Sequence, residues 1–293
     1  MGKEKVKPIG ALKAFLATDK NSRVIGPVDR YLLTRPASKR SSLVIHPSEM
    51  ASETWCHRAQ YFWLKGYTPK HEAIGLRKAL IFAQGHSIHK TWQNWFHEMG
   101  KLKGKWFCTV CKTSYFGVPS DHPGTCKYNV VYEEVPLQFD PLRIAGHADG
   151  WLVDLGDPLL LEIKSIGEGS IRWYAPHIAM KHSNFKDMWD AIDAPFHEHI
   201  QQAQIYMKLM EHMGLKDAPQ EAVILYEAKG LHEVKEFIVP KSDFGVSDLF
   251  ESVVQIISAI DRGVAPLCNI GGTNGCNKCS HYTEEESGEP TSD

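Results

Sequence analysis

The chain has 293 residues, of which 43% are hydrophobic, and it carries a formal net charge of -2 with a pI near 6.7. The length and hydrophobic content are enough for a sizeable core in one domain with insertions. The charge excludes the global positive field that many nucleic-acid-binding proteins show. No stretch approaches the ~20 apolar residues of a membrane helix, and MGKEKVKPIG lacks a signal-peptide core, so we expect a soluble cytoplasmic protein without membrane partners.

The first half of the chain contains two predicted helices and one irregular segment. Residues 1–47 mix Lys, Arg, Ser and Pro with short apolar pieces, and we expect an irregular N-terminal arm. Apolar residues at helical spacing then predict helices over 48–66 and 76–99 within a core of 48–266. Between 100 and 128, turn-forming residues and cysteines predict an insertion (101–128) rather than a long strand.

The second half is rich in strands. Three β-forming runs, VVYEEVPLQF, RIAGHADGWLVDL and PLLLEIKSI, are separated by turn residues and predict consecutive antiparallel strands. A helix over 195–213, strands over 221–228 and 233–239 and a helix over 242–261 complete a predicted α/β fold with a mixed sheet flanked by helices. The acidic tail 282–293 is poor in apolar residues and is expected to be disordered.

Three reactive side chains fall on two neighbouring predicted strands. A hairpin turning at 156–157 would place Asp149 opposite Lys164 and diagonal to Glu162, and alternation puts Glu162 and Lys164 on one face. Two close carboxylates repel each other unless a cation lies between them, and their oxygens suit Mg²⁺ or Mn²⁺. Lys164 can then orient or deprotonate water, or stabilise charge on a phosphate. The alternative is a surface acid beside an exposed cross-strand pair.

These residues lie in a familiar order. The segment GHADGWLVDLGDPLLLEIKS resembles the paired motifs of RecB-like PD-(D/E)XK nucleases, with Asp149, Glu162 and Lys164 at the matching positions. Ala148 stands where the family motif has Pro. The resemblance implies a restriction-endonuclease-like fold and Mg²⁺- or Mn²⁺-dependent hydrolysis of DNA phosphodiester bonds by these three residues.

Two helical motifs extend this resemblance. AQGHSIHK offers the upstream histidine of the RecB-like branch, and HIQQAQIYMKL offers its downstream QxxxY. The resemblance implies that His89 is a further metal ligand, with His86 as the competing candidate. It also implies that Gln202 and Tyr206, which share one helix face, support the active site.

The seven cysteines form two clusters with CxxC spacing, which inside a cell indicates metal ligation before disulfides. Cys56, Cys268, Cys276 and Cys279 resemble the one-plus-three arrangement of iron–sulfur nucleases such as the CRISPR-associated Cas-four group and phage exonucleases. CHRAQYF resembles their CxRxxYF start. This implies a 4Fe–4S cluster joining the first helix to a C-terminal segment, 267–281. The Cx7CxxC spacing departs from that family, so Zn²⁺ on the same sulfurs is the alternative.

The second cluster lies in the insertion. CTVCKTSYFGVPSDHPGTC offers Cys108, Cys111 and Cys126, and His122 is the nearest fourth ligand. A CxxC followed by a third cysteine at this distance predicts a small zinc knuckle.

The stretch SIRWYAPHIAMKHSNFKDMW interleaves cations with aromatic rings, which suits single-stranded nucleic acid, although the rings of an amphipathic helix can equally be core. The candidate DNA contacts are Arg172, Trp173, Lys181 and Lys186. We therefore expect a DNA exonuclease acting on single strands or single-stranded ends, alongside replication, recombination or repair proteins; the resemblance allows a phage origin.

Two other function classes compete with an exonuclease. One is a non-catalytic nucleic-acid-binding module that works with a partner enzyme, and the intact acid-acid-lysine set argues against it. The other, a zinc-dependent hydrolase of small substrates, lacks an HExxH helix.

Overall fold

The computed structural model describes residues 23–35, 43–67, 74–126 and 129–282. These residues divide into two compact units, one comprising 23–35 and 74–84 and the other 43–67, 85–126 and 129–282.

The described part of the smaller unit consists of helix α2 (Ile25–Thr34) and the beginning of α5 (Leu76–Glu98). The Asp29 carboxylate accepts a hydrogen bond from the Leu76 N–H at 2.7 Å and so caps the start of α5. The expectation of a wholly irregular arm over 1–47 is therefore wrong at α2, where apolar residues recur at helical spacing. Residues 1–22 and 36–42 of that arm lie outside the described residues.

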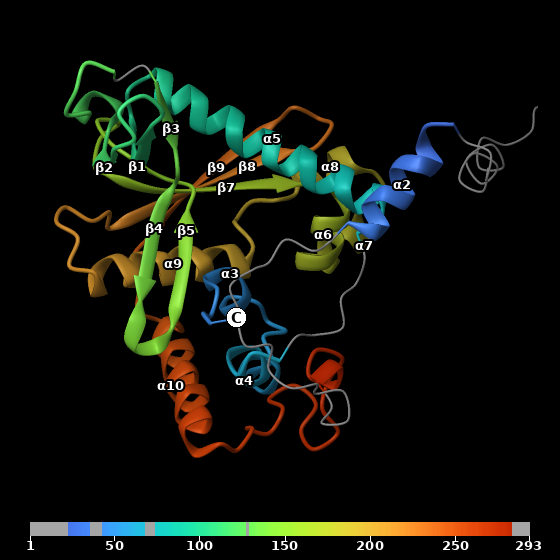
Figure 1. The fold of residues 1–293 in the computed structure, drawn as a ribbon. Coiled ribbons are helices and arrows are strands. Elements are labelled where there is room, and N and C mark those ends of the chain that lie inside the picture. The colour runs from blue at the N-terminus through green and yellow to red at the C-terminus, as the bar shows by residue number, and fades with distance from the viewer. Residues whose placement is uncertain (1–22, 36–42, 68–73, 127–128, 283–293) are drawn as a thin grey trace, which may run out of the picture. The chain divides into compact units, whose positions relative to one another are not determined.

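The larger unit is built on a mixed, mostly antiparallel sheet with the strand order β2-β1-β6-β7-β8-β9, and β3 pairs with β1 (Figure 1). β7 and β8 run parallel, and the other pairs are antiparallel. This confirms the predicted mixed sheet flanked by helices. The strands are β1 (Leu102–Cys108), β2 (Ser114–Gly117), β3 (Val130–Tyr132), β6 (Gly150–Leu152), β7 (Leu159–Ile166), β8 (Glu221–Ala228) and β9 (Val234–Pro240).

The first strand corrects one prediction. Residues 101–128 were expected to hold no long strand, but β1 has seven residues and pairs with β6 in the main sheet. Leu102 and Trp106 are fully buried and alternate with lysines, which is the pattern of a half-buried strand. The predicted insertion therefore contributes two strands, β1 and β2, to the sheet, and only its remaining residues lie outside it.

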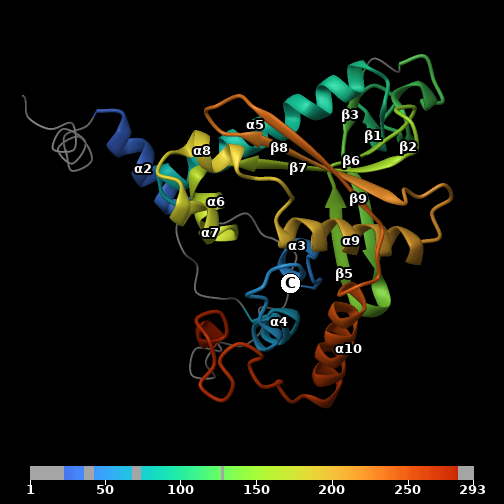
Figure 2. The same ribbon diagram turned by 180° about the vertical axis from the view of Figure 1, so that it is seen from behind.

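The two faces of β7 enter different cores. Ile163 packs in a core with residues of α5, whereas Leu160 packs in the larger core that contains α9 (His197–His212). Figures 1 and 2 show α9 and the second half of α5 on opposite sides of the sheet. Since side chains alternate along a strand, Glu162 and Lys164 lie on the side of α9.

Each of the first two predicted strands is interrupted at an acidic residue. β3 ends before Glu134 and β4 (Val135–Phe139) follows, while β5 (Ile144–Ala148) ends before Asp149 and β6 follows. β4 and β5 form a separate two-stranded ribbon joined by a 3-10 turn, η2 (Asp140–Leu142), and the ribbon packs against α9. The breaks leave both acids outside the regular ladders.

The register of the β6–β7 hairpin differs from the predicted one. Gly150 pairs with Leu161, and continuing this register places Asp149 beside Glu162 rather than opposite Lys164. The turn is centred earlier than predicted, and it contains two residues with positive φ, Asp154 at 55° and Gly156 at 101°. A shift of two residues keeps every side chain on its expected face, so the three reactive groups still converge.

The predicted helix over 48–66 is two short helices, α3 (Pro47–Met50) and α4 (His57–Leu64). Between them, Ser52 Oγ accepts from the Thr54 N–H at 3.3 Å, and the Glu198 carboxylate accepts from the Glu53 N–H at 3.0 Å. Such local side-chain bonds to the backbone compete with helical hydrogen bonds and end the first helix.

The remaining predicted elements of the second half are confirmed: α9, β8, β9 and α10, which packs against α4 and α9. The aromatic-rich stretch after β7 forms three short helices, and short 3-10 turns lie in the insertion and near the end of the chain. These elements are α6 (Glu168–Tyr174), α7 (Pro176–Lys181), α8 (Phe185–Asp190), α10 (Val246–Arg262), η1 (Pro119–Asp121) and η3 (Ser280–Tyr282).

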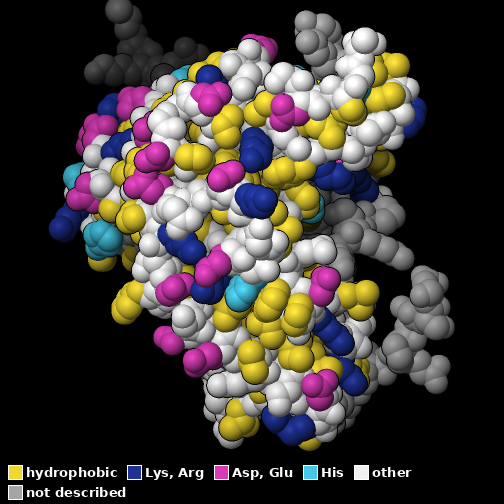
Figure 3. Space-filling model, turned by 90° about the vertical axis from the view of Figure 1, so that its left-hand side faces the viewer, with side chains coloured by type: hydrophobic (Ala, Val, Ile, Leu, Met, Phe, Trp, Pro, Cys, Tyr) yellow, Lys and Arg dark blue, Asp and Glu magenta, His cyan; other side chains and the backbone are white. Residues whose placement is uncertain are grey.

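The described surface has mixed charge. Basic and acidic side chains are interspersed over the face drawn in Figure 3. Within the described ranges, no helix has the length and apolar character needed to cross a membrane. Residues 283–293 of the predicted acidic tail lie outside the described part of the chain.

Candidate active site and metal centres

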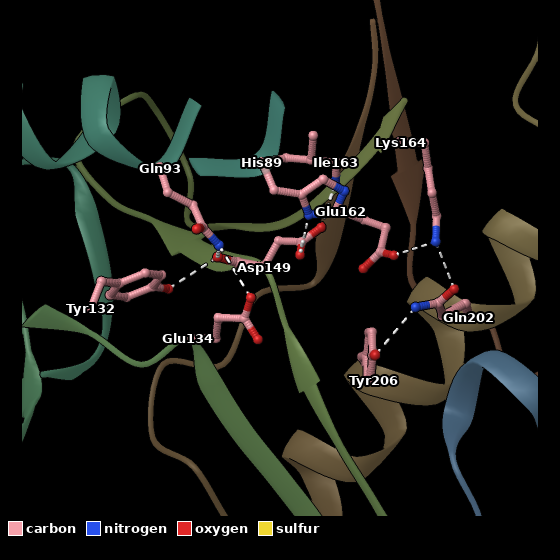
Figure 4. Close-up of polar contacts among 10 residues, drawn as sticks. All are labelled: His89, Gln93, Tyr132, Glu134, Asp149, Glu162, Ile163, Lys164, Gln202 and Tyr206. Atoms are coloured by element: carbon pink, nitrogen blue, oxygen red, sulfur yellow. Dashed lines mark hydrogen bonds and ion pairs between the residues drawn. The ribbon is translucent and has the colours of Figure 1, made fainter. Parts of the chain in front are cut away.

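Asp149 is held by contacts at both its side chain and its backbone (Figure 4). Its Oδ2 accepts a hydrogen bond from the Ile163 N–H at 2.6 Å, which ties the break before β6 to the middle of β7. Its carbonyl accepts from Gln93 Nε2 at 3.0 Å and from the Tyr132 hydroxyl at 3.1 Å. With 8% of its surface exposed, the residue has little freedom to move.

Glu162 and Lys164 form a buried ion pair on β7. Lys164 Nζ lies 2.7 Å from Glu162 Oε1, and Glu162 is only 3% exposed. The pKa of Glu162 is raised to about 7, mainly by burial; the charge of Lys164 lowers it and the charge of Asp149 raises it. Burial disfavours the charged form of Lys164, but the Glu162 carboxylate outweighs this and raises the Lys164 pKa. The lysine is therefore a cation at neutral pH.

His89 reaches this site from α5, as the resemblance implies. Its Nδ1 lies 3.0 Å from Asp149 Oδ1. Burial lowers the pKa of His89, but the hydrogen bond and the charge of Asp149 outweigh burial, and the net shift is upward. His86 is exposed. Of the two histidines, His89 is the one placed beside the carboxylates.

Gln202 and Tyr206 lie one turn apart on α9 and continue the polar chain (Figure 4). Gln202 Oε1 accepts from Lys164 Nζ at 2.8 Å, and Gln202 Nε2 donates to the Tyr206 hydroxyl at 3.2 Å. Because the ammonium can only donate, it fixes the orientation of the amide. Tyr206 also closely approaches Gly146 of β5, where a Cβ would lie 3.3 Å from its ring.

Three residues of the site were missed from the sequence. Gln93 and Tyr132 hold the Asp149 carbonyl, and Glu134 lies 3.5 Å from Gln93 Nε2. Burial raises the pKa of Glu134, and the negative charge of Asp149 raises it further. Gln93 falls one turn after His89 on α5, and Glu134 interrupts an apolar strand pattern; both signals were present in the sequence.

The predicted ligands of the knuckle come together. Cys108 Sγ lies 3.4 Å from Cys126 Sγ, and His122 Nε2 lies 3.3 Å from Cys111 Sγ and 3.6 Å from Cys126 Sγ. The four ligand atoms all lie within 4.8 Å of one another. Hydrogen bonds lower the pKa of Cys111 to about 6, which favours the thiolate that metals bind. This group can hold a metal ion such as zinc.

The four remaining cysteines also converge, although they come from both ends of the larger unit. Cys56 is the N-cap of α4, and Cys268, Cys276 and Cys279 lie in the loop after α10. Their sulfurs lie within 4.8 Å of one another, so this C-terminal cysteine cluster can hold a metal ion as well. Backbone N–H groups of Ala59, at 3.4 Å from Cys56, and of Gly271, at 3.2 Å from Cys268, point at the sulfurs.

The predicted DNA contacts have different environments. Trp173 on α6 is 67% exposed, and Lys181 at the end of α7 is exposed as well. Arg172 pairs with Glu168, and Lys186 pairs with Asp190 and Glu233, so both cations are partly neutralised. In the same stretch, Trp189 is fully buried, as the amphipathic-helix alternative requires.

No family model matches the chain, and no curated protein matches it. Among solved structures, it is similar to SSO0001, with 12% identity and a TM-score of 0.34 over 84% of this chain and 86% of that one. It is similar to an alkaline exonuclease, LHK-Exo from Laribacter hongkongensis, with 11% identity and a TM-score of 0.42 over 75% and 89% of the chains. LHK-Exo in complex with dAMP gives 13% identity and a TM-score of 0.37 over 75% and 89%. Because the identities and TM-scores are this low, the chemistry of the site rests on its own geometry.

Proposed function

We propose that this chain is a divalent-metal-dependent nuclease that hydrolyses phosphodiester bonds in DNA, acting as an exonuclease on single strands or single-stranded ends. The observation that carries this proposal is the meeting of Asp149, Glu162 and Lys164 in a nearly buried site. A structural ion pair would not need a second buried acid beside it, because like charges destabilise each other in a medium of low polarity.

The two acids fit a hard divalent cation. The raised pKa of Glu162, caused by burial and by the charge of Asp149, indicates that positive charge is in short supply at this point. Asp149 and Glu162 would hold Mg²⁺ or Mn²⁺ through carboxylate oxygens, and His89 would add a nitrogen. When bound, the cation supplies Lewis acidity, which makes water more acidic and offsets negative charge on the phosphate.

Lys164 would act as a charged donor rather than as a base. It is protonated at neutral pH, and two of its three N–H groups donate to Glu162 and Gln202. The third can donate to an attacking water or to a phosphate oxygen, and the ammonium stabilises the charge that grows on that oxygen. Gln202 keeps the amine in place, and Tyr206 keeps Gln202 in place.

The knuckle would carry structural zinc. Three sulfurs and one imidazole nitrogen would supply all four ligands and leave no open position, which is typical of structural rather than catalytic zinc. Its Cys108 pairs with Val130 at one end of β3, and Tyr132 at the other end donates to the Asp149 carbonyl. Zinc would therefore stabilise the strand that supports the catalytic acid.

Substrate would approach along the helices after β7. Trp173 offers an exposed ring on which a base can stack, and Lys181 offers a cation for a phosphate. The mixed charge of the surface limits strong contacts to such local groups.

The proposal is tested with 5′- and 3′-end-labelled oligonucleotides, single-stranded, blunt or with overhangs, incubated with Mg²⁺, Mn²⁺ or EDTA, with RNA of the same sequence as a control. We expect shortened DNA products with either metal and none with EDTA. Binding of DNA without cleavage under every metal condition would favour the non-catalytic module instead.

A further inference from the structure

We propose that the centre formed by Cys56, Cys268, Cys276 and Cys279 is a tetrahedral site for a single zinc ion, and that it does not hold the 4Fe–4S cluster implied by the resemblance. The proposal concerns a structural centre and is independent of the proposed nuclease activity.

The sulfur spacing carries the proposal. Cys56 Sγ lies 3.7 Å from Cys268 Sγ, and Cys276 Sγ lies 3.8 Å from Cys279 Sγ. In a regular tetrahedron with Zn–S bonds of about 2.3 Å, the sulfurs lie about 3.8 Å apart. All four sulfurs lie within 4.8 Å of one another, so the whole set has the size of one ion's coordination sphere.

A cubane cluster is too large for this set. Its four thiolates bind four different irons at alternate corners of a cube, and because the metal–sulfur bonds of about 2.3 Å point outward from those corners, the sulfurs lie on the order of 6 Å apart. Every pair of sulfurs in this centre is closer than that. The residues therefore do not fit the cluster without moving apart.

The knuckle provides an internal comparison. Its Cys108–Cys126 sulfurs lie 3.4 Å apart, and the distance from His122 Nε2 to Cys126 Sγ is 3.6 Å. Three sulfurs and an imidazole suit zinc, and bonds of about 2.3 Å to sulfur and about 2.1 Å to nitrogen in a tetrahedron give an N–S distance of about 3.6 Å. The four-cysteine centre has the same dimensions, which indicates the same kind of ion.

The loop is tied down close to the sulfurs. Asn269 accepts from the His57 N–H at 2.8 Å and donates to the Trp55 carbonyl at 2.9 Å, so it bridges both sides of Cys56. Gly271 packs so tightly that a Cβ would lie 1.7 Å from the Gly275 carbonyl oxygen. Widening the centre to admit a cluster would disrupt these contacts.

A closed set of four sulfurs gives the zinc no open coordination position and no redox chemistry. The centre would join the start of α4 to the chain after α10, and its metal ion would not change oxidation state.

The test is the metal content of the full chain, purified without oxygen from cells supplied with both iron and zinc. We expect two zinc ions per chain, one for each cysteine group, with neither iron nor acid-labile sulfide and no broad absorbance at about 400 nm. Iron with acid-labile sulfide and that absorbance overturns the proposal. A total of one zinc ion per chain, lost when the knuckle cysteines are replaced, overturns it as well.

Two matched double variants assign the ions. Cys108→Ser with Cys111→Ser should halve the zinc content, and X-ray absorption of the remaining ion should show four sulfurs at about 2.3 Å. Cys276→Ser with Cys279→Ser should also halve it. In the Cys108→Ser, Cys111→Ser variant, the remaining ion is that of the four-cysteine centre, and nitrogen among its ligands would overturn the assignment. This measurement does not require the Cys276→Ser, Cys279→Ser variant to fold.

Discussion

The Asp149 carboxylate accepts a hydrogen bond of 2.6 Å from the backbone N–H of Ile163, the residue between Glu162 and Lys164. This bond links a residue outside the regular strands to the centre of a buried one. Because a backbone N–H has a fixed direction, Asp149 Oδ2 is aimed at β7, and Oδ1 is left for His89 or a cation.

Gln202→Leu should lower the cleavage rate about tenfold without unfolding the protein, because Lys164 loses the acceptor that positions it. Tyr206→Phe, which removes only the hydroxyl that Gln202 bonds, should have a smaller effect. The check is a double-variant cycle: in a Lys164→Ala background, Gln202→Leu should cause almost no further loss of cleavage rate. Independent, additive losses would show that Gln202 acts elsewhere.

A Cys108→Ser, Cys111→Ser double variant should lose the zinc of the knuckle, and its cleavage rate should fall by about tenfold because β3 no longer holds Tyr132 firmly against Asp149. Elemental analysis and a cleavage assay check both parts. Val110→Ala in the same loop, where the side chain is 60% exposed, is the control and should keep its zinc. Unchanged zinc in the double variant would rule out the knuckle site.

Cys56→Ala should lower Tm by at least about 3 °C, because the loop after α10 would lose a metal link to α4. Asn269→Ala is the matched control, since it removes two hydrogen bonds between the same segments but no ligand. Asn269→Ala should lower Tm less than Cys56→Ala does, and the protein should keep the metal. Equal Tm values for the parent and Cys56→Ala would contradict a stapling role for this centre.

Stability should fall as pH decreases below about 6.5, partly because of His199. Burial, aided by the charge of Lys164, lowers the pKa of His199, so the folded state keeps it neutral while the unfolded chain protonates it near 6.5. The Tyr226 hydroxyl accepts from the Phe196 N–H and lies 2.6 Å from His199 Nδ1, so a neutral His199 can accept the proton of this hydroxyl.

The size of this effect can be isolated with His199→Gln. Over the pH range between the folded and unfolded pKa values, one such group contributes a slope of about 1.4 kcal/mol per pH unit. Urea unfolding at pH 7, 6 and 5 should show the variant losing less stability than the parent. Identical slopes for both proteins would mean that His199 is protonated in the folded state.

Much of the site could be anticipated because its chemistry depends on local periodicity. Two residues apart on a strand, Glu162 and Lys164 had to share a face, and Gln202 and Tyr206, four apart on a helix, had to do the same. These relationships do not depend on which turn joins the strands, so a register error of two residues left them intact.

The sequence did not predict the features of the site that depend on where strands end. Glu134 and Asp149 lie outside the ladders, and nothing in an alternating pattern says that a strand will stop at an acid rather than carry it outward. Likewise, β1 was missed because its turn-rich continuation obscured seven residues of regular alternation. The choice between zinc and a cluster needed distances between sulfurs, which sequence spacing cannot supply.

The central claim is that the acid-acid-lysine set performs catalysis. The most direct measurement compares Glu162→Gln and Lys164→Ala with two exposed controls, Glu251→Gln and Lys216→Ala, in metal-dependent cleavage of end-labelled DNA. The account predicts that each site variant loses at least about a hundredfold in rate while remaining folded, and that both controls cut normally. It also predicts that Lys164→Ala still binds Mn²⁺, because the carboxylate ligands remain. A Lys164→Ala variant that cuts DNA at the parent rate would contradict the account.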